Sequence, residues 1–224
     1  MTNSTYDLSK IKAVIFDMDG LMFNTEEIYR MAQTEMARRR GKEFTDEIHR
    51  GMMGKASGED VQVMLDAWGL DEDQMKAFNE RNELFLSFVD DHIEPEKGLM
   101  RLIEVLSDNN MRMMIASGST KQIIEKNVTK YNVQDRFEYI LSGDEVKYGK
   151  PDPEMYLKAV GMLRSTPGQC LVIEDSVNGV ISGKKAGCAV FAVPNKWSKD
   201  SDFSQADAVF DDLDQIADLF DQNY

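Results

Sequence analysis

Short apolar segments of high β propensity alternate along most of this chain with segments in which apolar residues recur at the period of a helix. A strand that is apolar at every position is typical of a parallel sheet with helices on both faces, because neither face of that strand meets water. The sequence therefore predicts an α/β fold, a Rossmann-like, doubly wound parallel sheet. The predicted strands are Ile11–Phe16, Arg112–Ala116, Tyr139–Leu141, Cys170–Ile173, Ala189–Val193 and Ala208–Phe210.

Helical segments separate most of these strands. One of them is expected to begin after Ser176, a residue type that caps helices, and to end before Gly187. The predicted helices are Leu99–Asp108, Thr120–Tyr131, Pro153–Leu163, Val177–Ala186 and Leu213–Phe220.

The gap between the first two strands is far longer than an ordinary crossover connection. It contains three helical segments, Glu26–Arg40, Gly58–Trp68 and Asp73–Val89, and no convincing strand. We therefore predict an inserted all-helical cap domain at residues 23–93, with a core domain made of residues 1–22 and 94–224. Linkers near Leu21–Asn24 and His92–Gly98 would hold the insertion above a strand end, as in a lid.

The composition limits the possible partners and locations. The formal net charge of the 224-residue chain is −14, which argues against binding to nucleic acid or to an anionic membrane surface. No apolar run approaches the roughly 18 residues of a membrane span. Met1–Lys10 lacks the apolar block of a secretory signal, and the two cysteines lie within apolar runs. A cytoplasmic location is expected. The sequence does not define the oligomeric state, and a monomer is compatible with it.

Two carboxylates directly follow the first predicted strand, in the sequence Asp17-Met18-Asp19-Gly20. In an open parallel sheet the ligand crevice lies at the carboxyl ends of the strands, where these carboxylates are expected. Turns also favour Asp and Gly for backbone reasons alone. Taken by itself, the motif is equally compatible with a turn and with a site.

Polar residues follow three further predicted strands. Ser117-Gly118-Ser119-Thr120 offers hydroxyl and backbone N–H groups to an anion, although Ser119 capping a helix explains it as well. Lys150 lies between a glycine and two prolines, which restrict where its ammonium can point, but a surface lysine in a turn is the alternative. Glu174-Asp175-Ser176 places two acids at the end of a buried strand, with helix capping as the other interpretation.

The combination is more specific than any single motif. Four strand ends carry, in chain order, two carboxylates, a small hydroxyl, a lysine and an acidic pair, which are the groups for hard-cation binding and phosphate chemistry. With these motifs the chain resembles the haloacid dehalogenase superfamily, in the subfamily that includes β-phosphoglucomutase and pseudouridine 5′-phosphatase. The resemblance extends from about Ile11 to Phe220, and the helical insertion is similar to the cap domain of that subfamily.

The resemblance implies a Mg²⁺-dependent phosphatase that hydrolyses a small phosphomonoester, of the sugar phosphate or nucleotide type. It makes Asp17 the nucleophile that forms a phospho-aspartate, and Asp19 the general acid and base. The acid at Asp19 favours phosphoryl transfer over dehalogenation, because dehalogenation needs no proton for the leaving group. The implied phosphate-binding residues are Ser117, Gly118 and Lys150, of which Ser117 and Lys150 also stabilise the transferring group. The implied Mg²⁺ ligands are Asp17, the Asp19 carbonyl, Glu174 and Asp175.

Two alternatives come with this interpretation. A β-phosphoglucomutase carries a histidine where this chain has Tyr29, and the segment Gly54–Gly58 supplies Lys55 but no arginine for a second phosphate, which favours a phosphatase. Lys55 is the candidate cap residue for substrate binding, with a solvated loop lysine equally compatible. Asn24 replaces the Asp usual in related phosphatases and is interpreted as a hinge residue or as a residue that supports the site without contacting the substrate. A catalytically silent binding module of the same fold is disfavoured, because it has no use for both Asp17 and Asp19.

Overall fold

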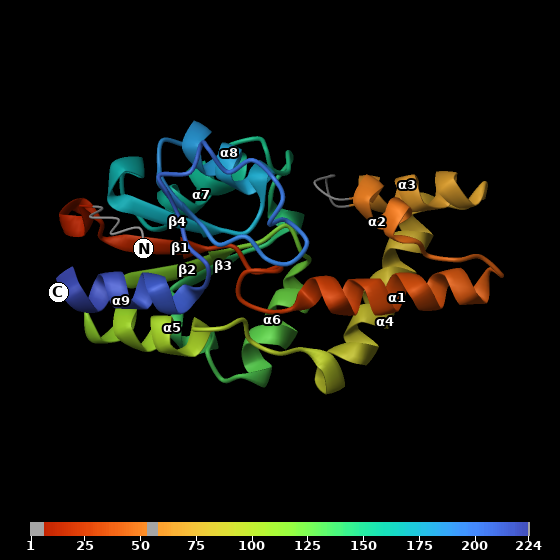
Figure 1. Cartoon of the computed structure of the whole chain (residues 1–224), viewed down its shortest axis with the longest axis horizontal. Helices are drawn as coiled ribbons and strands as arrows, with labels where there is room; N and C mark the ends of the chain where they lie inside the picture. The colour runs from red at the N-terminus through yellow and green to blue at the C-terminus, as the bar shows by residue number, and fades with distance from the viewer. Residues whose placement is uncertain (1–6, 53–57, 224) are drawn as a thin grey trace.

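The computed structural model describes residues 7–52 and 58–223 (Figure 1). Six parallel strands form one sheet in the order β3-β2-β1-β4-β5-β6. The predicted doubly wound parallel sheet is therefore confirmed, with β1 at its centre and Ala13 paired with both Arg112 and Cys170. The strands are β1 (Ala13–Phe16), β2 (Arg112–Ala116), β3 (Tyr139–Leu141), β4 (Cys170–Glu174), β5 (Ala189–Ala192) and β6 (Ala208–Val209).

Helices cover both faces of this sheet (Figure 1). In β1, Val14 and Phe16 join the apolar cluster of one face, and Ala13 and Ile15 join that of the other. Every residue of β1 is fully buried, as expected for a strand with helices on both sides. The helices of the first face are α5 (Leu99–Asp108), α6 (Lys121–Lys130) and α9 (Leu213–Asn223), and those of the second are α7 (Glu154–Met162) and α8 (Val177–Lys185). Short 3-10 helices lie at Leu8–Lys10, Gln134–Arg136, Gly143–Glu145 and Pro167–Gln169.

The long segment between β1 and β2 folds into helices that pack beside the sheet (Figure 1). They share an apolar cluster of their own, which includes Met36, Leu65 and Leu84. These helices are α1 (Thr25–Arg39), α2 (Asp46–Met52), α3 (Glu59–Trp68) and α4 (Gln74–His92). Helix α2 was not predicted, because it is short and has only two buried positions, which are too few to reveal a helical period of apolar residues. The domain boundaries proposed around residues 23–93 stay a prediction. None of the helices described has the length and apolar character needed to cross a membrane.

The two linkers of the insertion lie side by side. Phe23 forms an antiparallel bridge with Pro95, and the Glu96 N–H donates to the Met22 carbonyl at 2.8 Å. The Asn24 side chain fastens the pair, because its Oδ1 accepts from Glu94 N at 2.7 Å and its Nδ2 donates to the His92 carbonyl at 3.3 Å. This position supports the interpretation of Asn24 as a hinge residue.

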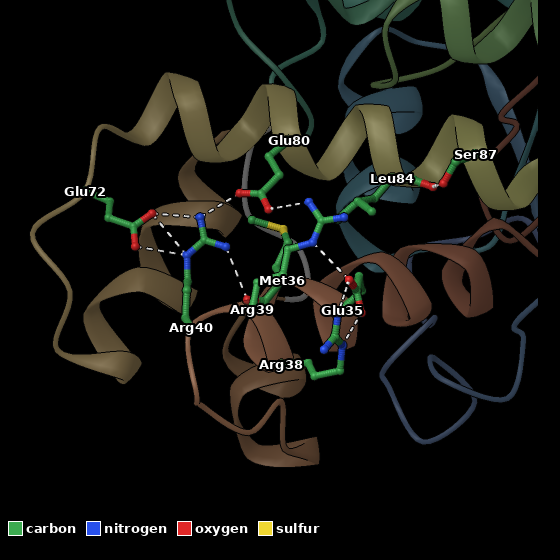
Figure 2. A network of polar contacts seen from close by, with 9 residues as sticks. All are labelled: Glu35, Met36, Arg38, Arg39, Arg40, Glu72, Glu80, Leu84 and Ser87. Atoms are coloured by element: carbon green, nitrogen blue, oxygen red, sulfur yellow. Dashed lines mark hydrogen bonds and ion pairs between the residues drawn. The ribbon is translucent and has the colours of Figure 1, made fainter.

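A charged network joins the end of α1 to the start of α4 (Figure 2). The Arg40 guanidinium donates to Glu72 at 2.7 Å and to Glu80 at 2.6 Å, and Arg39 donates to Glu80 at 3.1 Å. The Arg40 side chain is only 14% exposed, so these bonds are partly shielded from water. They lower the pKa of Glu80, chiefly through the hydrogen bond from Arg40.

The first prediction concerns this network. We expect Arg40→Met to lower the free energy of unfolding by about 1–2 kcal/mol at pH 7, measured by urea denaturation. Because the folded-state pKa of Glu80 lies below its ordinary value of 4.5, the stabilisation is present above pH 4.5 and is lost as the pH falls further. The difference between parent and variant should therefore shrink in acid. The matched variant Arg39→Met, at a side chain that is 47% exposed, should cost less. An Arg40→Met deficit that is equal at all pH values would contradict the prediction.

Candidate active site

The residues predicted from the sequence meet at the carboxyl edge of the sheet, around a cavity of about 350 Å³. Asp17 and Asp19 follow β1, Ser117 and Gly118 follow β2, and Glu174 and Asp175 lie at the end of β4. The segment before α7 adds Lys150. The cavity lining includes Asp17, Asp19, Gly118, Lys150 and Asp175. Lys55 lies outside the described residues.

Lys150 ties two of these carboxylates together. Its Nζ donates to Asp17 Oδ1 at 2.5 Å and to Glu174 Oε1 at 2.6 Å. Burial alone would lower the pKa of Lys150, but the charges of Asp17 and Glu174 raise it well above the ordinary value. Lys150 is therefore an ammonium at neutral pH and holds one Asp17 oxygen in a fixed position.

Glu174 is fully buried and bonded through both of its carboxylate oxygens. Oε1 accepts from Lys150 and, at 2.5 Å, from the Tyr156 hydroxyl. Oε2 accepts from the Ser176 hydroxyl at 3.0 Å and from the backbone N–H groups of Asp175 and Ser176. A carboxylate held this firmly fixes the ammonium of Lys150 and the start of α8.

Three buried acids lie close enough to hold a metal ion. Asp17, Glu174 and Asp175 each offer an oxygen, and these atoms lie within 4.8 Å of one another. Burial and then the neighbouring carboxylates raise the pKa of Asp175, and burial chiefly raises that of Asp17. One ammonium does not balance three buried carboxylates, and leaving such charges unpaired is costly. A hard divalent cation prefers these oxygen ligands, so the residues present fit such an ion.

Asp19 is held differently from Asp17. Its Oδ2 accepts from the Ser117 hydroxyl at 2.6 Å and from the Ser119 hydroxyl at 2.9 Å. Burial raises the pKa of Asp19, and the two hydroxyl donors oppose that change. The Tyr29 hydroxyl, from α1, lies 2.9 Å from Ser119 Oγ. Because Ser119 donates to Asp19, the Tyr29 hydroxyl donates to Ser119.

This arrangement corrects one alternative from the sequence analysis. Ser119 does not cap a helix, since the N-cap of α6 is Thr120 and the Ser119 side chain points to Asp19. The Ser176 hydroxyl accepts from Gly179 N at 3.1 Å, so the predicted cap of α8 is confirmed. Gly187 has the positive φ of 82° predicted for a residue that follows a helix.

Two side chains near the site were missed. Asn195 Nδ2 donates to Asp175 Oδ2 at 2.8 Å and to the Gly20 carbonyl at 3.2 Å. Asn195 follows the carboxyl end of β5, so the rule that found the other strand ends could have found it. Tyr156 lies within α7, where an aromatic residue on a buried helix face carries no sequence signal for a site. Gly20 has a φ of 78°, and a Cβ there would lie 2.5 Å from Asn195 Nδ2, so this turn requires glycine.

The second prediction tests how closely Glu174 is packed. A Cβ on Gly179 in α8 would lie 1.9 Å from the Glu174 carboxylate, which must then move and release Lys150. Gly179→Ala should therefore lower both the melting temperature and the activity, the latter by at least about 10-fold. Gly161→Ala in α7 is the matched control, because nothing lies within 4 Å of its Cβ position. That variant should be as stable as the parent or more so. Equal behaviour of the two variants would refute the prediction.

Comparison with known proteins places the chain in a family. The model of the haloacid dehalogenase-like hydrolase family matches residues 14–193. The phosphorylated carbohydrates phosphatase of Thermotoga maritima is 30% identical over 178 residues, which are 79% of this chain and 82% of that protein. The bifunctional riboflavin kinase/FMN phosphatase of Arabidopsis thaliana is 31% identical over 214 residues, which are 95% of this chain and 56% of that protein.

A solved structure shows the same fold. The β-phosphoglucomutase of Clostridium difficile superposes with a TM-score of 0.79 and 22% identity, over 95% of this chain and 98% of that one. The match to the family model covers well over half of the chain. The chain is therefore an enzyme of the haloacid dehalogenase-like hydrolase family, with the β-phosphoglucomutase-like form of its fold.

Proposed function

We propose that this enzyme is a Mg²⁺-dependent phosphatase that hydrolyses a small phosphomonoester through a phospho-aspartate on Asp17. The observation that carries the proposal is the arrangement of Asp17, with one carboxylate oxygen held by Lys150 and two further acids within ligand distance. The names of its relatives, a phosphorylated carbohydrates phosphatase and an FMN phosphatase, support the same reaction type.

The first half of the reaction transfers the phosphoryl group to the enzyme. A carboxylate oxygen of Asp17 attacks phosphorus, and the bond from phosphorus to the ester oxygen breaks with its electron pair on that oxygen. Asp19 gives the leaving oxygen a proton, and its raised pKa favours the protonated form that this step needs. Lys150 and Ser117 donate to the phosphoryl oxygens, whose negative charge they stabilise.

The second half returns the enzyme to its starting state. A water molecule attacks the phosphorus of the phospho-aspartate, and Asp19 takes the proton that the water loses. The bond between phosphorus and the Asp17 oxygen then breaks, which restores the carboxylate and releases inorganic phosphate. Ser119 holds the Asp19 carboxylate through both steps by its hydrogen bond to Oδ2, while Ser117, which has one hydroxyl proton, turns it from Asp19 to the phosphoryl group when substrate binds.

The proposed Mg²⁺ site uses the acids at the ends of β1 and β4. Asp17, Asp175 and the Asp19 carbonyl are the proposed direct ligands, and Glu174, whose oxygens already accept hydrogen bonds, would act close to the ion or its waters. Mg²⁺ held there would supply positive charge to the phosphoryl oxygens and to the carboxylates that face them. Asn195 holds Asp175 for this role through the bond to Oδ2.

The cavity favours a substrate with a single phosphate. Among the residues that the structure describes, its lining includes the carboxylate of Glu26 in addition to Asp17, Asp19 and Asp175, against the two cations Lys147 and Lys150. A second anionic group would meet this excess of negative charge, whereas sugar hydroxyls can donate to it. We therefore propose a sugar phosphate, with a nucleotide-type ester second and a mutase reaction disfavoured. The substrate role of Lys55 and the cytoplasmic location stay predictions, and the oligomeric state stays open.

The third prediction tests the nucleophile. The parent should release phosphate from sugar monophosphates without a bisphosphate activator. Asp17→Asn should lower this release by at least about 10³-fold. The melting temperature should not fall. Lys150 keeps its ion pair with Glu174, and the amide reduces the excess of buried carboxylates over ammonium groups. Asp91→Asn, at an exposed position of α4, is the control and should behave as the parent. An Asp17→Asn enzyme that turns over normally would exclude the mechanism.

The fourth prediction tests the cation. Chelator should abolish activity and Mg²⁺ should restore it, and Mg²⁺ alone should raise the melting temperature of the parent. Asp175→Asn should increase the Mg²⁺ concentration needed for half-maximal activity by at least about 10-fold and should remove the thermal shift. Asp200→Asn changes an exposed acid and should leave both readouts unchanged. Full activity of the parent in excess chelator would count against the site.

A further inference from the structure

The loop that follows β5 joins the proposed cation site to the helical insertion. Asn195 uses both ends of its carboxamide, because Nδ2 donates to Asp175 Oδ2 and Oδ1 accepts from Trp197 N, each at 2.8 Å. Ser198 Oγ donates to the main-chain carbonyl of Asp175 at 2.7 Å. The position of Trp197 therefore depends on the residues that hold Asp175.

The indole of Trp197 contacts two helices of the insertion. The guanidinium carbon of Arg30, from α1, lies 4.8 Å from the centre of the indole ring. The imidazole of His49, from α2, lies 4.9 Å away at an angle of 70°, which is an edge-to-face contact. Cation–π and edge-to-face contacts of this kind favour one relative placement of the groups. Trp197, from the loop that follows β5, thus contacts both α1 and α2.

The same part of the insertion contributes Glu26 to the wall of the catalytic cavity. His49 Nε2 lies 3.6 Å from Glu26 Oε2, and Glu26 lines the cavity beside Asp19 and Asp175. The next residue, Glu27, forms an ion pair with Lys196, the neighbour of Trp197. A shift of α1 away from Trp197 would therefore also move Glu26 out of the cavity wall.

We propose that Trp197 and Asn195 are positioning residues for the reaction. Trp197 holds α1 and α2 over the cavity, and Asn195 links this contact to the orientation of Asp175. The inference rests on the proposed phosphatase function for the role of Asp175. Its physical basis is that the insertion joins the sheet through two linkers, so the contacts of Trp197, together with those of Ile28 and Tyr29, hold α1 in its place.

A fluorescence experiment tests the contact without substrate or metal. The sequence contains two tryptophans, so Trp68→Phe leaves Trp197 as the single reporter. In that background Arg30→Met should move the emission to longer wavelength, because the indole becomes more solvated, and Asn195→Ala should do the same. The matched control is Arg39→Met on the same helix, whose side chain is 47% exposed and bonds to Glu35 and Glu80, away from the indole, and it should leave the emission unchanged. Equal spectra for Arg30→Met and Arg39→Met, or no shift with Asn195→Ala, would overturn the proposal.

A kinetic experiment separates positioning from simple packing. Trp197→Ala should lower kcat/KM for a sugar phosphate by about 10-fold, mainly through a higher KM, because α1 no longer holds the cavity wall in place, and should lower kcat/KM for the smaller acetyl phosphate by much less. Asn195→Ala should weaken Mg²⁺ binding, measured by calorimetry, by about 10-fold. Equal losses with both substrates, or an unchanged Mg²⁺ affinity, would overturn the assignment. A parent enzyme that releases no phosphate would refute the proposed function, and the fluorescence spectra would still decide the inference.

Discussion

The site depends on four carboxylates that crowd around one largely buried ammonium, that of Lys150, among the residues that the structure describes. Three of these acids are buried, namely Asp17, Glu174 and Asp175, and Asp19 is half-buried beside them at the carboxyl edge of the sheet. Like charges repel strongly in such surroundings, so each group needs a partner that fixes it. The partners are Lys150, the Ser117 and Ser119 hydroxyls, Tyr156 and Asn195. A protein of net charge −14 can receive an anionic substrate in this place only if a cation reverses the local sign.

The sheet supplies the geometry that this charge cluster requires. Because β1 lies between β2 and β4, the residues that follow these three strands meet without long connections. Asp17 and Asp175 come from neighbouring strands, and Gly20 allows the chain to turn beside Asn195. The insertion then contributes Tyr29, which contacts Ser119, and Glu26, which lines the cavity. The chemistry thus rests on rigid strand ends, while the surroundings of the substrate come from helices attached by two linkers.

The sequence predicted the strands and the residues at their ends, because both depend on local patterns. The apolar run at β1 and the acids that follow it were visible together, and so was the acidic pair after β4. Tyr156 and α2 were not predicted, because a buried tyrosine resembles a core residue and a seven-residue polar helix shows no period. The role of Ser119 was open, since capping and bonding to Asp19 need the same residue type. The contact between Arg30 of α1 and Trp197 in the loop after β5 joins segments far apart in the sequence, so no local sequence pattern predicts it.

The most direct test of the phospho-aspartate mechanism is to trap the covalent intermediate on Asp17. The enzyme would be mixed with a sugar phosphate and Mg²⁺, quenched with acid during the first turnover, digested, and analysed by tandem mass spectrometry. The phospho-aspartate mechanism predicts a phosphoryl group on Asp17 that forms at least as fast as phosphate is released and then decays. Phosphate release with an unmodified Asp17 throughout the first turnover, or with the phosphoryl group on another residue, would contradict it.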